Sequence, residues 1–247
     1  MKKIYTRREF EELRREWADE MYDDKALQDK ALEVFTEADR HNWIHQTTWM
    51  GEPSLQTPED LITFQEIIYA TQPEYIIEVG VAWAGSVLFY ATLMEILDKG
   101  KIIGIDIFIP DDLKERIMNH KLAHRIELIE KSSIDEDTFN YVKNKIGDSR
   151  NVMVHLDSDH TCDHVYKELK LYEELVGKGN YLICGDTMVE YFPVQKHRPR
   201  DWKPGNSPKT ALDMFLQEND RFEVDLTFDK KRLMTNQPGG YLKCIKD

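Results

Sequence analysis

Two short polar segments carry the residue types best suited to chemistry. Asp157 and His160 lie three positions apart, and Asp186 follows the next expected strand along the chain. Two carboxylates held close together repel each other unless a cation, a proton or a hydrogen-bond donor lies between them. A hard ion such as Mg²⁺ would bind these oxygens and a substrate oxygen beside them. We therefore expect Asp157 and Asp186 to hold a metal ion.

His160 is the candidate general base of this site. An imidazole can accept a proton from a hydroxyl group near neutral pH, so we expect His160 and Asp157 to be the catalytic pair. His164 follows one helical turn later and could orient His160. A histidine in a loop is often only a surface or capping residue, and that alternative stays open.

A long connection between residues 190 and 207 carries a cluster of cationic side chains. Loops of this length in compact domains are often lids or substrate clamps. The chain has a net charge of −13, so a local cationic cluster could bind an anionic substrate such as a nucleotide sugar. A solvated loop without a binding role is the alternative. The expected substrate-binding residues are His160, His164, Lys196, Arg198 and Arg200.

The segment from Glu78 to Ser86 is typical of a strand-to-helix turn that binds a ligand. Gly80 allows a tight turn, and Gly85 would let the helix begin close to the ligand. Exposed N–H groups and the Ser86 hydroxyl would favour an anionic group there. Because Ala82 stands where a dinucleotide site needs a second glycine, the turn favours S-adenosylmethionine, whose ammonium group Glu78 could bind. A turn without a ligand is the alternative.

Further cofactor contacts are expected where the next strands end. Asp106 closes the second strand, where a carboxylate can hold both hydroxyls of a ribose. Ser132 and Ser133 follow the third strand and could meet the adenine edge, although a helix cap explains them at least as well. The expected cofactor-binding residues are Glu78, Gly80, Gly85, Ser86, Asp106, Ser132, Ser133 and Asp157.

These residues need a sheet that brings its strand ends together. Five apolar strands alternate with helical segments, which predicts parallel strands covered on both faces. They span residues 75–79, 102–107, 126–130, 152–156 and 181–186. Residues 222–228 and 241–245 are joined by a turn without a helix, so we expect an antiparallel pair. The predicted fold class is α/β, a Rossmann-like, mostly parallel seven-stranded sheet whose ligands bind beyond the carboxyl ends of its strands.

The first forty residues lack the alternation of strand and helix patterns that the rest of the chain shows. Phe10, Leu13, Trp17 and Met21 recur every three or four positions in a charged segment, which predicts an amphipathic helix followed by another at residues 26–38. We expect residues 1–50 to be a helical extension and residues 51–247 to be the S-adenosylmethionine-binding domain. The helices would serve packing or self-association, so a homo-oligomer is expected.

Composition limits the partners of the chain. Its 247 residues and net charge of −13 argue against nucleic acid or an anionic membrane as partner, because both need a basic surface. A small molecule is the expected partner. Three widely spaced cysteines and the lack of a signal-peptide pattern or a long apolar run predict a reduced protein in the cytoplasm.

Taken in order, the motifs between Trp49 and Lys243 resemble the cephalosporin hydroxylase/rhamnosyl O-methyltransferase family of bacterial enzymes. The resemblance implies a class I methyltransferase fold, S-adenosylmethionine as cofactor and, often, a divalent metal. The matching segments are Trp49-Met50-Gly51, Gln56 to Leu61, Glu78-Val79-Gly80 through Gly85-Ser86, Gly104 to Ile107, Leu156 to Thr161, Gly205 to Ala211 and Gly240 to Lys243.

One position departs from the family pattern. The family's metal site resembles two adjacent acids after the fifth strand, and here the first is replaced by Gly185. Asp157 and Asp186 carry over, while Asp159, His160, water or substrate could complete the ligand set, or no metal could be needed. We expect an S-adenosylmethionine-dependent O-methyltransferase acting on a small molecule, a sugar or nucleotide sugar in glycan or natural-product biosynthesis. A nicotinamide-dependent oxidoreductase and a non-catalytic partner protein are the alternatives.

Overall fold

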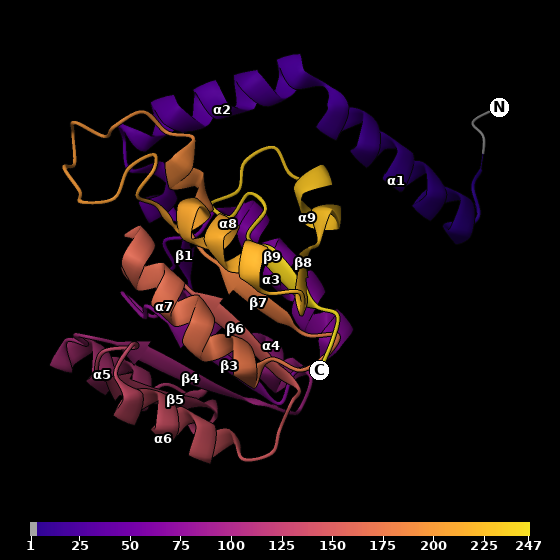
Figure 1. Cartoon of the computed structure of the whole chain (residues 1–247). Helices are drawn as coiled ribbons and strands as arrows, with labels where there is room; N and C mark the ends of the chain where they lie inside the picture. The colour runs from indigo at the N-terminus through magenta and orange to yellow at the C-terminus, as the bar shows by residue number, and fades with distance from the viewer. Residues whose placement is uncertain (1–3) are drawn as a thin grey trace.

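A seven-stranded sheet forms the centre of the computed structural model, which describes residues 4–247 (Figure 1). The strand order is β5-β4-β3-β6-β7-β9-β8. Strands β3 to β7 are parallel and β8 pairs antiparallel with β9, as the sequence predicted. β9 also pairs antiparallel with β7. The strands are β3 (Tyr75–Val79), β4 (Lys101–Asp106), β5 (Ile126–Glu130), β6 (Val152–Leu156), β7 (Tyr181–Cys184), β8 (Phe222–Val224) and β9 (Tyr241–Cys244).

Helices cover both faces of the sheet, so each central strand is apolar on both sides. In β3, Ile76 belongs to the cluster packed under α3, α4 and α5, whereas Ile77 belongs to the cluster under α6, α7 and α8. This two-sided burial explains why the strands are continuous apolar runs. The helices are α3 (Pro58–Thr71), α4 (Gly85–Ile96), α5 (Asp111–Met118), α6 (Glu136–Ile146), α7 (Cys162–Tyr172) and α8 (Pro208–Glu218).

Local capping fixes where several helices begin. The Thr57 hydroxyl accepts a hydrogen bond from the backbone N–H of Asp60 at 3.1 Å, with Pro58 in the first helical position of α3. That helix ends at Thr71, with Gln72 as its C-cap, and so stops before Pro73 as predicted. Ser207 caps α8 in the same way through the N–H of Thr210. Short 3₁₀ helices lie at η1 (Trp43–Gln46), η2 (Ala123–Arg125), η3 (Glu173–Leu175) and η4 (Thr187–Glu190).

The C-terminal part corrects two predicted strands. The strand predicted at 222–228 ends at Val224 and is followed by helix α9 (Leu226–Lys230), because the Asp225 side chain accepts a hydrogen bond from the N–H of Thr227 and begins a turn. A helix therefore does separate β8 from β9. The strand predicted at 181–186 stops at Cys184. A small hairpin of β1 (Thr48–Trp49) and β2 (Glu52–Pro53) was not predicted.

Two helices precede the sheet, as expected. α1 (Arg7–Asp23) has no buried residue, and its first turns project beyond the body while Asp19 in its second half pairs with Lys230 of α9 (Figure 1). α2 (Lys25–Asp39) buries Ala31, Phe35 and Asp39. Among residues 4–247, no helix combines the length and the apolar character that crossing a membrane requires.

Candidate cofactor and acceptor site

The carboxyl ends of three neighbouring strands are held in register at one edge of the sheet. Val79 pairs with Leu156, which in turn pairs with Cys184. The N–H of Asp157 donates to the carbonyl of Val79 at 2.7 Å, and the N–H of Gly185 donates to that of Leu156 at 2.8 Å. Because β3 has β4 on one side and β6 on the other, a ligand crevice is expected at this point.

A first cavity of about 450 Å³ lies above the ends of β3, β4 and β5; we name it the cofactor cavity. It brings together most of the residues expected to bind the cofactor, although they come from four separate loops. Its lining includes Gly80, Asp106, Ser132, Ser133 and Asp157. Sequence spacing and strand order alone were enough to predict this grouping.

The turn after β3 is fixed by Asp106. One oxygen of its carboxylate accepts hydrogen bonds from the N–H groups of Val81 and Ala82 at 2.8 and 3.0 Å, and the other accepts one from the N–H of Phe108 at 3.2 Å. Gly80 has a φ of +98°, and a side chain there would place its Cβ 2.0 Å from the carbonyl oxygen of Asp157. Only glycine fits this position.

Gly85 and Glu78 have roles other than direct ligand contact in this structure. A Cβ at Gly85 would lie 2.3 Å from the carbonyl oxygen of Pro53, so the glycine admits the β2 segment rather than a ligand, which corrects the expectation. Glu78 is 1% exposed and lines neither cavity. Burial raises the pKa of Glu78 against the hydrogen bonds from His155 and Ser86. Its second carboxylate oxygen has no hydrogen-bond partner among the described residues.

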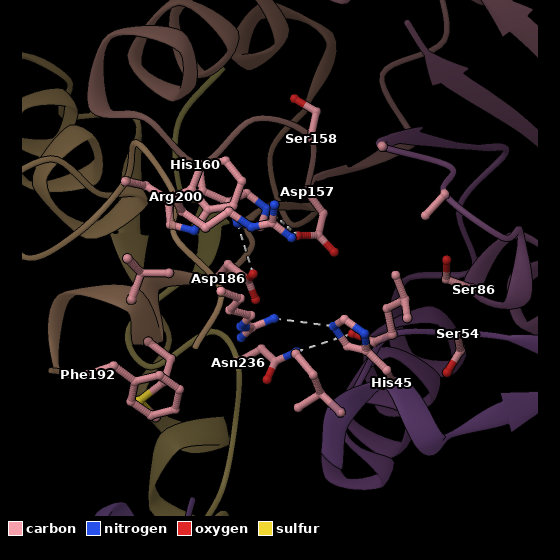
Figure 2. A pocket seen from close by; sticks show the side chains of 18 of the residues that line it. His45, Ser54, Ser86, Asp157, Ser158, His160, Asp186, Phe192, Arg200 and Asn236 are labelled. Carbon is pink, nitrogen blue, oxygen red and sulfur yellow. Dashed lines mark hydrogen bonds and ion pairs between the residues drawn. The ribbon is translucent and has the colours of Figure 1, made fainter. Parts of the chain in front are cut away.

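A second cavity of about 240 Å³ adjoins the first; we name it the acceptor cavity. Asp157, His160 and Asp186 lie on one side, and Ser54 and Ser86 lie across the space from them (Figure 2). The two cavities share Gly80, Ala82, Asp157, Ser158 and Trp202 in their linings. A ligand in one cavity would therefore meet a ligand in the other beside Asp157.

His160 lies between two carboxylates at this junction. Its Nε2 is 3.4 Å from Oδ1 of Asp157, and its Nδ1 is 3.0 Å from Oδ2 of Asp186 (Figure 2). Burial alone would lower the pKa of His160, but the two carboxylates raise it to about 9. A proton on the imidazole is therefore favoured while both carboxylates are charged, and the role of His160 as general base stays a prediction.

The carboxylates respond differently to the shared histidine. Burial raises the pKa of Asp186 against the attraction of His160. Burial would also raise the pKa of Asp157, but the hydrogen bonds from His160 and Gln56 and the positive charges of His155 and His160 together outweigh burial and lower the pKa. The imidazolium therefore occupies the place between two acids where a cation is needed.

The same three side chains fit a divalent cation. One ligand atom from each of Asp157, His160 and Asp186 lies within 4.8 Å of the others. Two carboxylates are suitable ligands for Mg²⁺, and water or substrate oxygen can complete its octahedral shell. At Gly185 a Cβ would lie 2.9 Å from Oδ1 of Asp157, so the second acid of the family pattern would need the site to widen.

The residues expected to bind substrate are divided between cavities. Arg198 and Arg200 line the acceptor cavity, whereas Lys196 lines an adjacent hollow of about 320 Å³ inside the 190–207 connection. His164 lines the cofactor cavity, and its Nε2 lies 3.0 Å from the buried carboxylate of Glu168. The expectation that His164 orients His160 is therefore wrong.

Several residues of the site were missed. Gln56 donates from Nε2 to Oδ2 of Asp157 at 2.7 Å, which fixes the carboxylate. The Trp202 ring lies 4.8 Å from that of His160, and the guanidinium of Arg200 lies 5.4 Å from the Trp202 ring. Glu168 could have been found from its spacing of four residues after His164 on α7. Gln56 offered no comparable signal, because it lies 101 residues from its partner.

Comparison with known proteins decides the class. Residues 41–245 match the family described as Rhamnosyl O-methyltransferase/CmcI. The chain belongs to this family. The methyltransferase is 28% identical over 214 residues to the rhamnosyl O-methyltransferase of Mycobacterium bovis (strain BCG / Pasteur 1173P2), with 82% of each chain covered. It is 29% identical over 210 residues to that of Mycobacterium leprae (strain TN), covering 82% of this chain and 87% of the relative.

Solved structures agree on the fold of the methyltransferase. An apo form of CmcI matches with a TM-score of 0.58 and 20% identity, covering 82% of this chain and 78% of that one. A CmcI structure described as a complex with Mg and SAM matches with a TM-score of 0.57 and 20% identity, covering 81% and 77%. The predicted fold class and family are confirmed. The protein is an S-adenosylmethionine-dependent O-methyltransferase, and neither the oxidoreductase nor the non-catalytic alternative is supported.

Proposed function

We propose that the enzyme methylates a hydroxyl group of a sugar that carries phosphate, such as a nucleotide sugar. The observation behind this proposal is the meeting of the two cavities at Asp157. The acceptor cavity has the cationic side chains of Arg198 and Arg200, and Arg200 also faces the adjacent hollow with Lys196 and Lys203. Cationic side chains beside a ligand cavity favour a phosphate-bearing ligand. The rhamnosyl O-methyltransferases among its relatives are consistent with a sugar acceptor.

The cofactor would lie with its ribose on Asp106 and its adenine near Ser132 and Ser133. Its methionine portion would follow the turn at Gly80, so that the methyl group faces the junction at Asp157. This pose uses residues that the cofactor cavity gathers, including Asp106. It also leaves the acceptor cavity free for the second substrate.

The reaction is an in-line displacement at the methyl carbon. The acceptor oxygen forms a bond to this carbon while the carbon–sulfur bond breaks, and S-adenosylhomocysteine leaves as the product. The hydroxyl proton passes to the carboxylate of Asp186, whose pKa burial raises to about 6, and His160 would accept it only after giving up its own proton. Because the sulfonium is already a good leaving group, the protein mainly aligns the reactants and excludes water. Asp157 and Asp186 would hold a divalent ion such as Mg²⁺, which supplies Lewis acidity toward the hydroxyl when bound.

A methyl-transfer assay against a panel of sugar nucleotides tests the acceptor class. The panel would include dTDP-L-rhamnose and UDP-glucose, each with its free sugar as control, in the presence and absence of EDTA. We expect turnover with a sugar nucleotide and at least a tenfold lower rate with the free sugar, since a charge-assisted hydrogen bond contributes roughly 1.5 to 3 kcal/mol. Equal rates for the free sugar would contradict a role for phosphate.

We also propose that the enzyme self-associates through α1. Phe10 and Trp17 are 44% and 50% exposed on one side of this helix. The first half of α1 holds Arg7, Arg8, Arg14 and Arg15 among three glutamates and is weakly positive, whereas the charged residues at its end are all acids. Antiparallel pairing with α1 of a second copy would bring these two halves together. The acids at the end are Asp19, Glu20 and Asp23.

Sedimentation velocity tests this pairing. Trp17→Glu should give a monomer under conditions in which the unmodified enzyme is a dimer or larger, because a charge would enter the apolar seam. Ile96→Glu is the matched control, since Ile96 is 75% exposed at the end of α4, away from α1. A monomeric parent enzyme, or an assembly unaffected by Trp17→Glu, would refute the pairing.

Two further features remain proposals. We propose that residues 1–50 form a helical accessory segment and residues 51–247 the methyltransferase domain. The enzyme would work in the reducing cytoplasm, where Cys162, Cys184 and Cys244 stay as the free thiols seen in the structure.

A further inference from the structure

Asp39 is a buried carboxylate at the end of α2 that faces the 190–207 connection. It is 3% exposed. Its Oδ2 accepts a hydrogen bond from Nε2 of Gln195 at 2.6 Å and lies 3.3 Å from Nε2 of His197. Its Oδ1 accepts a hydrogen bond from Nη2 of Arg198. A carboxylate this far from solvent is stable only when donors and positive charge surround it, and here one loop supplies them all.

Arg198 is held at a second point by the N-terminal part of the chain. Its Nη1 lies 3.3 Å from Nε2 of His45, which follows α2 in the short helix η1. Burial and Arg198 lower the pKa of His45, so a neutral imidazole is available to accept this hydrogen bond. Nε of Arg198 is buried and has no hydrogen-bond partner among residues 4–247. Protein groups therefore hold two of the three nitrogens of the guanidinium, and the Arg198 side chain lines the acceptor cavity.

Aromatic packing attaches the same two segments to each other. The Phe35 ring of α2 meets the Phe192 ring edge-to-face at 5.2 Å, and it meets the Trp43 ring at 5.6 Å. Figure 1 shows α2 passing over the connection, and Figure 2 shows His45 and Phe192 at the cavity. Phe35, His45 and Arg198 all line the acceptor cavity. In contrast, none of residues 4–46 lines the cofactor cavity.

Charge distinguishes the two arginines of the acceptor cavity. Asp39 neutralises Arg198, whereas Arg200 lies over the Trp202 ring and forms no ion pair in the described part of the chain. A neutralised guanidinium favours an uncharged oxygen, while the unpaired one favours phosphate. Arg198 is thus suited to a sugar hydroxyl or ring oxygen, with Arg200 left for the charged group.

We propose that the N-terminal segment is an acceptor-recognition element, in which Asp39 positions Arg198 to bind an uncharged oxygen of the acceptor sugar. The proposal rests on the proposed function, because it needs a sugar in the acceptor cavity. Asp39 and the rest of α2 precede the family match, which begins at residue 41. Asp39 is a positioning residue: it acts through Arg198 and does not line the acceptor cavity itself.

Steady-state kinetics with dTDP-L-rhamnose test the role of Asp39. Asp39→Asn should raise KM for the sugar nucleotide about tenfold while changing kcat less than about twofold, because a charge-assisted hydrogen bond that orients Arg198 is lost. Asp39→Glu should recover most of the loss, since it restores the carboxylate. Glu37→Gln is the matched control, because Glu37 is exposed and pairs only with Arg40 in the described structure. The affinity for S-adenosylhomocysteine, measured by calorimetry, should stay unchanged in all three.

Limited trypsin digestion supplies a readout that needs no acceptor. Lys196 and Arg200 are cleavable sites within the connection, whereas Arg198 and Lys203 precede prolines. Cleavage after Lys196 and Arg200 should be several-fold faster in Asp39→Asn than in Glu37→Gln, because α2 no longer holds the connection. Unchanged KM and unchanged cleavage would overturn the proposal, as would a loss of cofactor affinity in step with KM. If the unmodified enzyme methylates no sugar nucleotide, the proposed function fails, and faster cleavage in Asp39→Asn is still required for Asp39 to hold Arg198.

Discussion

The cofactor cavity and the acceptor cavity are built in different ways. The turn of the cofactor cavity is held by Asp106, whose hydrogen bonds reach only 25 residues back along the chain to Val81. The acceptor cavity depends on the contact between Asp39 and Arg198, which lie 159 residues apart. The methyl-donor site is therefore a property of consecutive strands and turns, whereas the acceptor site is a property of tertiary packing. Acceptor preference can change while the donor site stays intact.

Asp157 belongs to both cavities, so its replacement should have the largest effect. Asp157→Asn keeps the shape of the side chain but removes a charge that His160 and a divalent ion both need. We expect kcat to fall by about 10² to 10⁴, the range for a lost acid–base or charge-stabilising group. Calorimetric affinity for S-adenosylhomocysteine should change only a few-fold.

The control for this substitution is Asp163→Asn, an exposed acid in the first turn of α7. It should leave kcat unchanged. If Asp157→Asn turned over as fast as the control, Asp157 would have no catalytic role. The proposal that donor and acceptor meet at Asp157 would then be wrong.

Replacing Asp106 tests the cofactor cavity alone. Asp106→Ala removes the proposed ribose contact and the acceptor of two turn N–H groups, so affinity for S-adenosylhomocysteine should fall roughly 10- to 100-fold. KM for the sugar nucleotide at saturating S-adenosylmethionine should stay the same. Asp111→Ala, at an exposed position of α5, is the control. A larger effect on the sugar nucleotide than on the cofactor would mean that the two cavities are assigned the wrong way round.

The sequence was informative where parallel strands alone decide the geometry. Gly80, Asp106, Asp157 and Asp186 follow different strands, and the sheet brings them to one edge whatever the loops do. The sequence was silent on Asp39, because pairing between a helix end and a distant loop depends on how α2 packs. Local competition caused the error at residues 222–228, where the cap formed by Asp225 outweighs an alternating apolar pattern.

Replacing His45 should have the smallest effect of these substitutions. It tests the acceptor cavity alone. Burial and Arg198 lower the pKa of His45 in the folded enzyme, although Asp39 opposes them. The unfolded chain therefore binds more protons below the ordinary histidine value of about 6.5, and the free energy of unfolding should decline as the pH falls through that range. His45→Gln should lose less stability between pH 7.5 and 5.5 in urea titrations than the unmodified enzyme does.

His41→Gln is the matched control for this measurement, because His41 is exposed just before η1. It should retain the full pH dependence. An identical loss of stability in the His45 variant and the control would show that His45 is not held neutral beside Arg198.

A crystal structure of the enzyme with S-adenosylhomocysteine tests the central claim most directly. The account predicts that the ribose hydroxyls lie on Asp106, the adenine lies near Ser133, and the sulfur faces Asp157 at the opening to the acceptor cavity. A ligand seated instead between His45 and Asp186, or one that leaves Asp106 without a ribose contact, would contradict the separation of donor and acceptor on which the account depends.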